Sequence, residues 1–146
     1  QYVEKESLSW EDIIELAKDD LVTIGCHTVN HYALNILDKN EILNEIIASK
    51  RELEEYINKD VNHFAYPYGM HDEASSREIE IVKDSRIFTT ATTTRLGNIF
   101  KAHNKDKFAL PRVQIIGTQQ DISIFDMYIC GMLPAIKNKL KRVVTL

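Results

Sequence analysis

The sequence predicts an α/β fold built around a parallel sheet. Short apolar runs that end in turn residues alternate with longer amphipathic stretches along the 146-residue chain, which is typical of βαβ units. The length fits one domain, and a hydrophobic content of 44% with a charged content of 27% is ordinary for a globular protein. No segment reaches the run of about 20 apolar residues that a membrane-spanning helix needs.

The amphipathic stretches begin at residues that cap helices. Ser9 precedes a first helix, which should end near residues 19–20, and Asp38 opens a long one, with Glu41 three residues later completing a capping pattern. The side of this long helix that we expect to be buried carries Ile42, Leu43, Ile46, Ile47, Leu53, Tyr56 and Ile57. Further helices are expected over residues 74–83, 121–131 and 134–142.

Four runs predict strands, over residues 21–26, 61–66, 87–92 and 108–116, and the third of them is rich in β-branched residues. The second run is stopped by Pro67 and Gly69, which break regular structure. In α/β folds, functional sites are built where strands end. The residues that follow the first two runs are therefore the first candidates for chemistry.

Composition and motifs exclude several functions. The formal net charge is −4, and no basic run occurs before Lys137–Arg142, which argues against a nucleic-acid partner. We expect that late cluster to be the solvated face of a last helix. The chain has neither a phosphate-binding glycine loop nor the G-x-S-x-G turn of serine hydrolases. Two cysteines are too few for a disulfide framework.

The most informative motif is His27-Thr28-Val29-Asn30-His31, directly after the first predicted strand. Two imidazoles four residues apart can converge on one divalent metal, and neutral imidazole is a preferred ligand of zinc. The alternative is a pair of loop histidines with no common ligand. Cys26 beside them is either a third, soft ligand or a small buried residue, and the second interpretation is favoured because free cysteine commonly packs as a hydrophobe.

A second motif, Phe64-Ala65-Tyr66-Pro67-Tyr68-Gly69, follows the second strand, and Leu110-Pro111-Arg112 comes later. In this order the three elements resemble the polysaccharide deacetylase family, the NodB-homology domain of carbohydrate esterase family four. The resemblance covers residues 8–131. It implies a distorted seven-stranded (β/α) barrel, similar to a TIM barrel, and a hydrolase that removes N-acetyl groups from a carbohydrate, with an N-acetylated sugar or polysaccharide as substrate.

The resemblance also assigns roles to residues. His27 and His31 match the two histidines that hold a divalent metal, commonly zinc, in the family. Thr28 could orient a ligand or simply form the turn. Tyr66, Pro67, Tyr68 and Gly69 match the stretch that lines the substrate groove, where the backbone N–H of Tyr68 has a catalytic role because it binds the oxyanion. Taken alone, Tyr-Pro-Tyr-Gly would be a plain turn after a strand.

Arg112 is the second candidate catalytic residue. Many family members carry an arginine before the Pro-Tyr-Gly stretch that orients the catalytic aspartate, whereas this chain has Ala65-Tyr66 there. We expect Arg112 to take that task through a charge-assisted pair with a carboxylate, the alternative being an ordinary surface arginine.

Two family elements have no match. The Thr-Phe-Asp-Asp-Gly motif, which supplies the base and the carboxylate ligand of the metal, is absent from residues 1–20. The late Leu-x-His, which supplies the general acid, is also absent, and His103 in a polar loop should be solvated. We therefore expect residues 1–146 to form one deacetylase domain that lacks its N-terminal strands.

Such a fragment should be inactive alone and should expose a sheet edge that favours self-association. The alternative function is a non-catalytic carbohydrate-binding or scaffolding relative that has lost its acid and base. The sequence carries no visible signal peptide and leaves the compartment open between the cytoplasm and the cell envelope.

Overall fold

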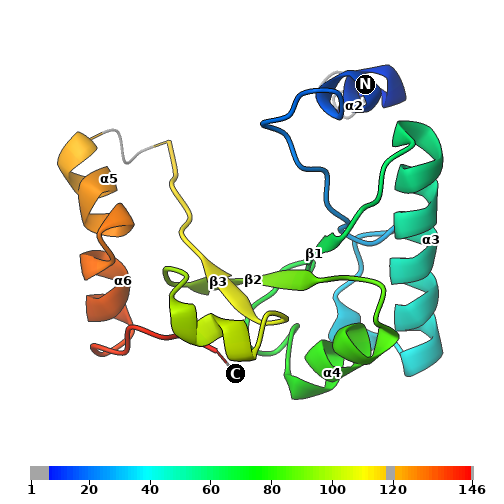
Figure 1. The fold of residues 1–146 in the computed structure, drawn as a ribbon. Coiled ribbons are helices and arrows are strands. Elements are labelled where there is room, and N and C mark those ends of the chain that lie inside the picture. Colours follow the sequence, from blue (N-terminus) through cyan, green and yellow to red (C-terminus); the bar gives the residue numbers. More distant parts are fainter. Residues whose placement is uncertain (1–6, 118–120, 146) are drawn as a thin grey trace.

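The computed structural model describes residues 7–117 and 121–145. Helices and strands alternate through most of this range (Figure 1), as the sequence predicts. In chain order the elements are α2 (Trp10–Leu16), the 3₁₀ helix η1 (Leu34–Ile36), α3 (Lys39–Ile57), β1 (His63–Ala65), α4 (Ser76–Ser85), β2 (Thr90–Leu96), the 3₁₀ helix η2 (Lys101–Lys105), β3 (Leu110–Arg112), α5 (Ile122–Ile129) and α6 (Met132–Lys137).

The described residues form a three-stranded sheet in the order β1-β2-β3, and both pairings are parallel. Phe64 lies opposite Ala91, and Thr92 lies opposite Leu110. This confirms the α/β class and the parallel sheet. The closed barrel is not present in these residues, because three short strands provide far fewer than the roughly eight that closure of such a barrel needs.

The first predicted strand forms a single β-bridge instead of a strand. Of residues 21–26, Cys26 alone pairs with β1, in an isolated parallel bridge opposite Phe64. The Cys26 N–H donates to the His63 carbonyl at 2.8 Å, and the Ala65 N–H donates to the Cys26 carbonyl at 2.9 Å. Because β1 is only three residues long, it offers few partners to its neighbour. The other three strands lie within or across their predicted ranges.

The core lies between the sheet and two helices. Phe64 of β1 and Ala91 of β2 pack with Ile42 and Ile46 of α3 and with Val82 of α4, and all five are buried. Long apolar side chains placed at i and i+4 on α3 bury one face of that helix against the sheet. The helical periodicity of the sequence therefore predicts this packing correctly.

Two residues expected on the buried side of α3 are half exposed. Ile47 is 48% exposed and Tyr56 is 46% exposed. The Tyr56 ring stacks on that of Trp10 in α2, with 3.8 Å between the ring centroids and 7° between the planes. Tyr56 thus attaches the short N-terminal helix to α3 instead of filling the core.

The helices α5 and α6 pack on each other beyond β3, on the side of the sheet away from α3 (Figure 1). Residues 138–145 then return to the sheet: the Asn138 side chain donates to the Leu96 carbonyl at 2.8 Å, and the Arg95 guanidinium donates to the Thr145 carbonyl. Among the described residues, no helix is both long and apolar enough to cross a membrane.

Candidate active site

The loop that carries the histidine pair starts where the Cys26 bridge ends. Two of its residues have positive φ angles, Thr28 at 64° and His31 at 56°. Positive φ is uncommon for residues other than glycine, and when it persists the surrounding structure must hold it in place. The loop is therefore a constrained turn rather than a loose connection.

Glu45 of α3 holds this turn. Its carboxylate accepts hydrogen bonds from the N–H groups of Val29 and Asn30, at 3.0 and 2.9 Å, and from the Asn30 amide. Within the turn the His31 N–H donates to the Thr28 hydroxyl at 3.0 Å. Burial alone would raise the pKa of Glu45, but the hydrogen bonds from Asn30 and Val29 outweigh it and lower that pKa. No local pattern in the sequence points to Glu45, because the loop that it holds lies 15 residues earlier in the chain.

We expect Glu45→Ala to loosen this turn. Hydrogen bonds to an ionised acceptor contribute about 1.5–3 kcal/mol each when shielded and less at a partly exposed site. Amide exchange at Val29 and Asn30 should therefore accelerate at least about tenfold, as measured by NMR. Glu52→Ala, which removes a carboxylate from the exposed side of the same helix, should leave these two amides unchanged.

Lowering the pH should loosen this turn in the same way as Glu45→Ala. Since folding lowers the pKa of Glu45, its stabilising contribution is complete above the ordinary glutamate value of about 4.3 and is lost as the pH falls through the lowered pKa. If the amide exchange rates of Val29 and Asn30 changed neither in Glu45→Ala nor at low pH, Glu45 would not hold this turn.

The two histidine rings lie together. Their centroids are 4.7 Å apart, with an interplanar angle of 70°. The Nδ1 atom of His27 is 2.8 Å from the Ala65 carbonyl oxygen. A carbonyl can only accept, so Nδ1 carries the proton and the lone pair is on Nε2. This is the arrangement usually found in a metal-binding histidine, whose second nitrogen donates to a backbone carbonyl.

The environment of His27 favours the neutral ring. Burial lowers the pKa of His27, and the positive charges of His31 and Arg112 lower it further, whereas the bond to Ala65 raises it; the net shift is downward. Neutral imidazole is the form that binds a divalent cation.

The Tyr-Pro-Tyr-Gly segment approaches the histidines from the end of β1. Tyr68 has a φ of 60° and is 56% exposed, and its ring lies edge-on to that of His31, with 5.0 Å between the centroids. Gly69 has a φ of 64° and is buried. Thr94 of β2 fixes both residues, since its hydroxyl donates to the Tyr68 carbonyl and its N–H to the Gly69 carbonyl.

Tyr66 and Pro67 do not present side chains to a groove. Tyr66 is fully buried, and its hydroxyl donates to the Phe108 carbonyl at 3.0 Å. Its ring packs edge-on to Phe64 in the core. Pro67 is buried as well. The expectation that all four residues of this motif line the substrate groove is therefore wrong for these two side chains. Tyr66 faces the core like Phe64 two residues earlier, Pro67 is buried in the turn that follows, and Tyr68 is the exposed member.

Arg112 lies at the end of β3, next to Leu96 of β2, and is exposed. In the part of the chain that the structure describes, it makes no ion pair. Arg112 and Thr94 line the same pocket, and the Thr94 hydroxyl donates to the Tyr68 carbonyl, so Arg112 lies close to the turn that carries Tyr68. The geometry thus brings together residues from three separate segments of the sequence, namely His27 with His31, Tyr68 with Gly69, and Arg112.

Two other side chains that could bind a metal, those of Cys26 and His63, have different surroundings. Cys26 is 1% exposed and burial raises the pKa of its thiol to about 11, which agrees with a packed, protonated residue. His63 bonds to the Thr90 hydroxyl through Nδ1 at 2.8 Å. Within residues 7–117 and 121–145, no group of three or more histidine, cysteine, aspartate or glutamate side chains is placed to hold a metal ion. The described residues offer two nitrogen donors, His27 and His31.

His103 was expected to be solvated, and this is wrong. It is 1% exposed, with Nδ1 accepting from the Phe100 N–H at 3.0 Å and Nε2–H donating to the Val144 carbonyl at 3.0 Å. Both nitrogens are therefore used to attach residues 100–105 to the C-terminal segment. The surrounding lysines and asparagine hide this in the sequence, because the partner Val144 is 41 residues away.

A comparison with protein families identifies the family of the chain. The polysaccharide deacetylase family model matches residues 1–83, which is more than half of the 146 residues. The chain belongs to the polysaccharide deacetylase family, as its motifs predict. No curated protein matches its sequence significantly.

Solved structures of this class are similar to the chain. A polysaccharide deacetylase from Bacillus cereus is 25% identical, with a TM-score of 0.72 over 84% of this chain and 37% of that one. The Streptococcus pyogenes deacetylase PplD, solved in complex with acetate, is 22% identical, with a TM-score of 0.69 over 85% and 53%.

IcaB from Ammonifex degensii is 21% identical, with a TM-score of 0.61 over 83% and 50%. The likeness to PplD and IcaB concerns the fold alone. Given these coverages, the chain spans about half of the length of PplD and of IcaB, and about a third of the Bacillus cereus protein. Family membership supports a deacetylase-type function.

Proposed function

We propose that this protein takes part in the metal-dependent hydrolysis of N-acetyl groups on a carbohydrate. The observation that carries the proposal is the convergence of His27 and His31, with the His27 Nδ1–H committed to the Ala65 carbonyl and its Nε2 left open. A constrained turn, held by Glu45, keeps both rings at the end of the sheet.

His27 and His31 would hold the metal, and zinc suits this donor set. The fit rests on two imidazoles at one end of the sheet, one of them already oriented by a backbone carbonyl. When bound, the metal would supply Lewis-acid polarisation of the acetyl oxygen and activation of water. A carboxylate ligand and the general base would come from residues other than those that the structure describes, so residues 1–146 alone should be inactive.

Tyr68 is the candidate for oxyanion binding. Its backbone N–H takes part in no backbone hydrogen bond among the described residues, and its left-handed conformation is held by Thr94. A fixed N–H donor that faces the reacting carbonyl stabilises the charge that develops there. The exposed Tyr68 ring, next to His31, offers an apolar surface on which a sugar ring could lie.

Arg112 would position the base. Its side chain is exposed, lines a pocket together with Thr94 and forms no ion pair among the described residues, so it is available to a carboxylate. The planar guanidinium can hold a carboxylate through two parallel hydrogen bonds and so fix its orientation.

Acetate release from a chitin pentasaccharide tests the proposal. The protein with a complete deacetylase domain should release acetate when loaded with zinc, lose at least about 90% of the rate after dialysis against a chelator, and recover it with zinc. Residues 1–146 alone should release none. A complete protein that binds the oligosaccharide and releases no acetate under any metal loading would instead be a carbohydrate-binding relative, and the proposal would be wrong.

A further inference from the structure

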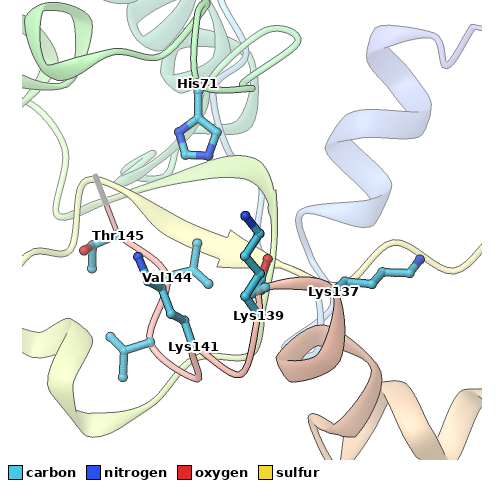
Figure 2. Close-up of a pocket in the computed structure, with 8 residues that line it drawn as sticks. His71, Lys137, Lys139, Lys141, Val144 and Thr145 are labelled. Carbon is cyan, nitrogen blue, oxygen red and sulfur yellow. The ribbon is translucent and has the colours of Figure 1, made fainter.

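A basic pocket lies beside the candidate active site. Its volume is about 370 Å³, and its lining includes three lysines, Lys137, Lys139 and Lys141, together with His71. The rest of the lining is Asn138 and the segment 143–145, so no carboxylate side chain of the described residues lines it. Figure 2 shows the Lys139 ammonium group extending toward His71 and that of Lys141 extending toward Thr145, whereas Lys137 points away.

The pocket is formed by anchored backbone. Lys139 and Leu140 both have positive φ angles, 53° and 67°, and they turn the chain sharply after α6. The segment that follows is attached through the Val144 carbonyl to His103 and through the Thr145 carbonyl to Arg95. Because both anchoring side chains are buried, the lysines project from a fixed wall.

The charge in this pocket is not neutralised locally. Among the described residues, neither Lys139 nor Lys141 forms an ion pair, and both are exposed. The chain as a whole is acidic, with 22 carboxylates against 18 lysines and arginines. Concentrating cations in one concavity of an acidic protein creates a local positive potential that extends about 8 Å at physiological salt.

The pocket is also close to the proposed reaction centre. His71 on its rim follows Tyr68 by three residues, which limits the separation of the two Cα atoms to about 11 Å. Gly69 between them is tied to β2 through Thr94, so this separation is fixed by the sheet. A glycan that extends from the histidine pair by one or two sugar units could therefore reach the lysines.

We propose that this pocket binds an acidic group, a carboxylate or a phosphate, of the same glycan whose N-acetyl group lies at the histidine pair. The inference rests on the proposed function and narrows it: the substrate class is an acidic, N-acetylated polysaccharide. A concave site next to the reaction centre favours a glycan-borne anion over a membrane surface, which would contact an exposed convex face.

Calorimetric titration of the purified protein with two hexasaccharides tests this inference. One is a neutral N-acetylglucosamine hexamer, and the other alternates N-acetylglucosamine with glucuronate. The acidic hexamer should bind at least tenfold more tightly at 50 mM salt, and the preference should shrink at 500 mM because exposed charges are screened. Equal affinity for the two hexamers at low salt would overturn the inference.

The double variant Lys139→Gln/Lys141→Gln should lose most of the preference. Since both lysines are exposed, the variant should melt as the parent does, which separates loss of binding from loss of folding. The matched control Lys39→Gln/Lys83→Gln removes two exposed charges elsewhere and should keep the preference within twofold. A double variant that still binds the acidic hexamer as tightly as the parent would overturn the inference.

Two further measurements separate this inference from its alternatives. If the double variant loses binding to phosphatidylserine vesicles while its affinity for both hexamers is unchanged, the pocket is a membrane contact and the inference is wrong. If the parent releases acetate and binds the two hexamers equally, the proposed function stands and this inference fails. A tenfold preference that depends on the lysines supports the pocket even if no acetate is released.

Discussion

Replacing His27 with alanine should abolish zinc binding and acetate release together in the protein with a complete deacetylase domain. The reason is geometric: His27 offers Nε2 because Nδ1 is bound to the Ala65 carbonyl, and its ring lies 4.7 Å from that of His31. Since the loss of a residue that merely orients a ligand already costs about 10–100-fold in metal affinity, the loss of a ligand should cost at least 100-fold. Metal content by mass spectrometry and acetate release measured on the same sample check this.

His63→Ala is the matched control for this experiment. His63 lies on β1 and bonds to Thr90, so it contributes nothing to the proposed metal site. The control should keep both zinc and turnover near the parent values. One equivalent of tightly bound zinc in a His27→Ala/His31→Ala double variant would rule out the assignment of these residues as ligands.

Gly69→Ala should destabilise the fold by about 2–6 kcal/mol and remove activity. Its φ of +64° is a conformation that costs a residue with a Cβ about 1–3 kcal/mol. A Cβ would also lie 2.9 Å from the Thr94 backbone nitrogen and 3.0 Å from the Tyr66 carbonyl oxygen, and relieving such overpacking typically costs a further 1–3 kcal/mol. The free energy of unfolding, measured in urea, gives the size of the effect.

Gly117→Ala provides the comparison for this substitution. A Cβ at Gly117 meets nothing within 4 Å, and its φ lies outside the left-handed region. The free energy of unfolding of that variant should lie within about 0.5 kcal/mol of the parent value. If Gly69→Ala were equally mild, the turn would not be the fixed support for Tyr68 that the structure indicates.

The sequence by itself predicts features that depend on neighbouring residues. The helix starts are an example: Ser9 with Asp12, and Asp38 with Glu41, form capping boxes in the structure because the interacting groups are three residues apart. The histidine pair is another, since a spacing of four residues within one turn is enough to bring the rings together.

The tertiary structure alone decided how distant segments meet. Glu45 reaches the histidine turn, Thr94 holds the Tyr68 turn, and Arg112 lines a pocket together with Thr94 because β2 and β3 pair in parallel. The buried states of Tyr66 and His103 depend likewise on the carbonyls of Phe108 and Val144, more than 40 residues away. Hydrogen bonds and burial across such separations are set by sheet pairing and packing, and no local pattern of residue types encodes them.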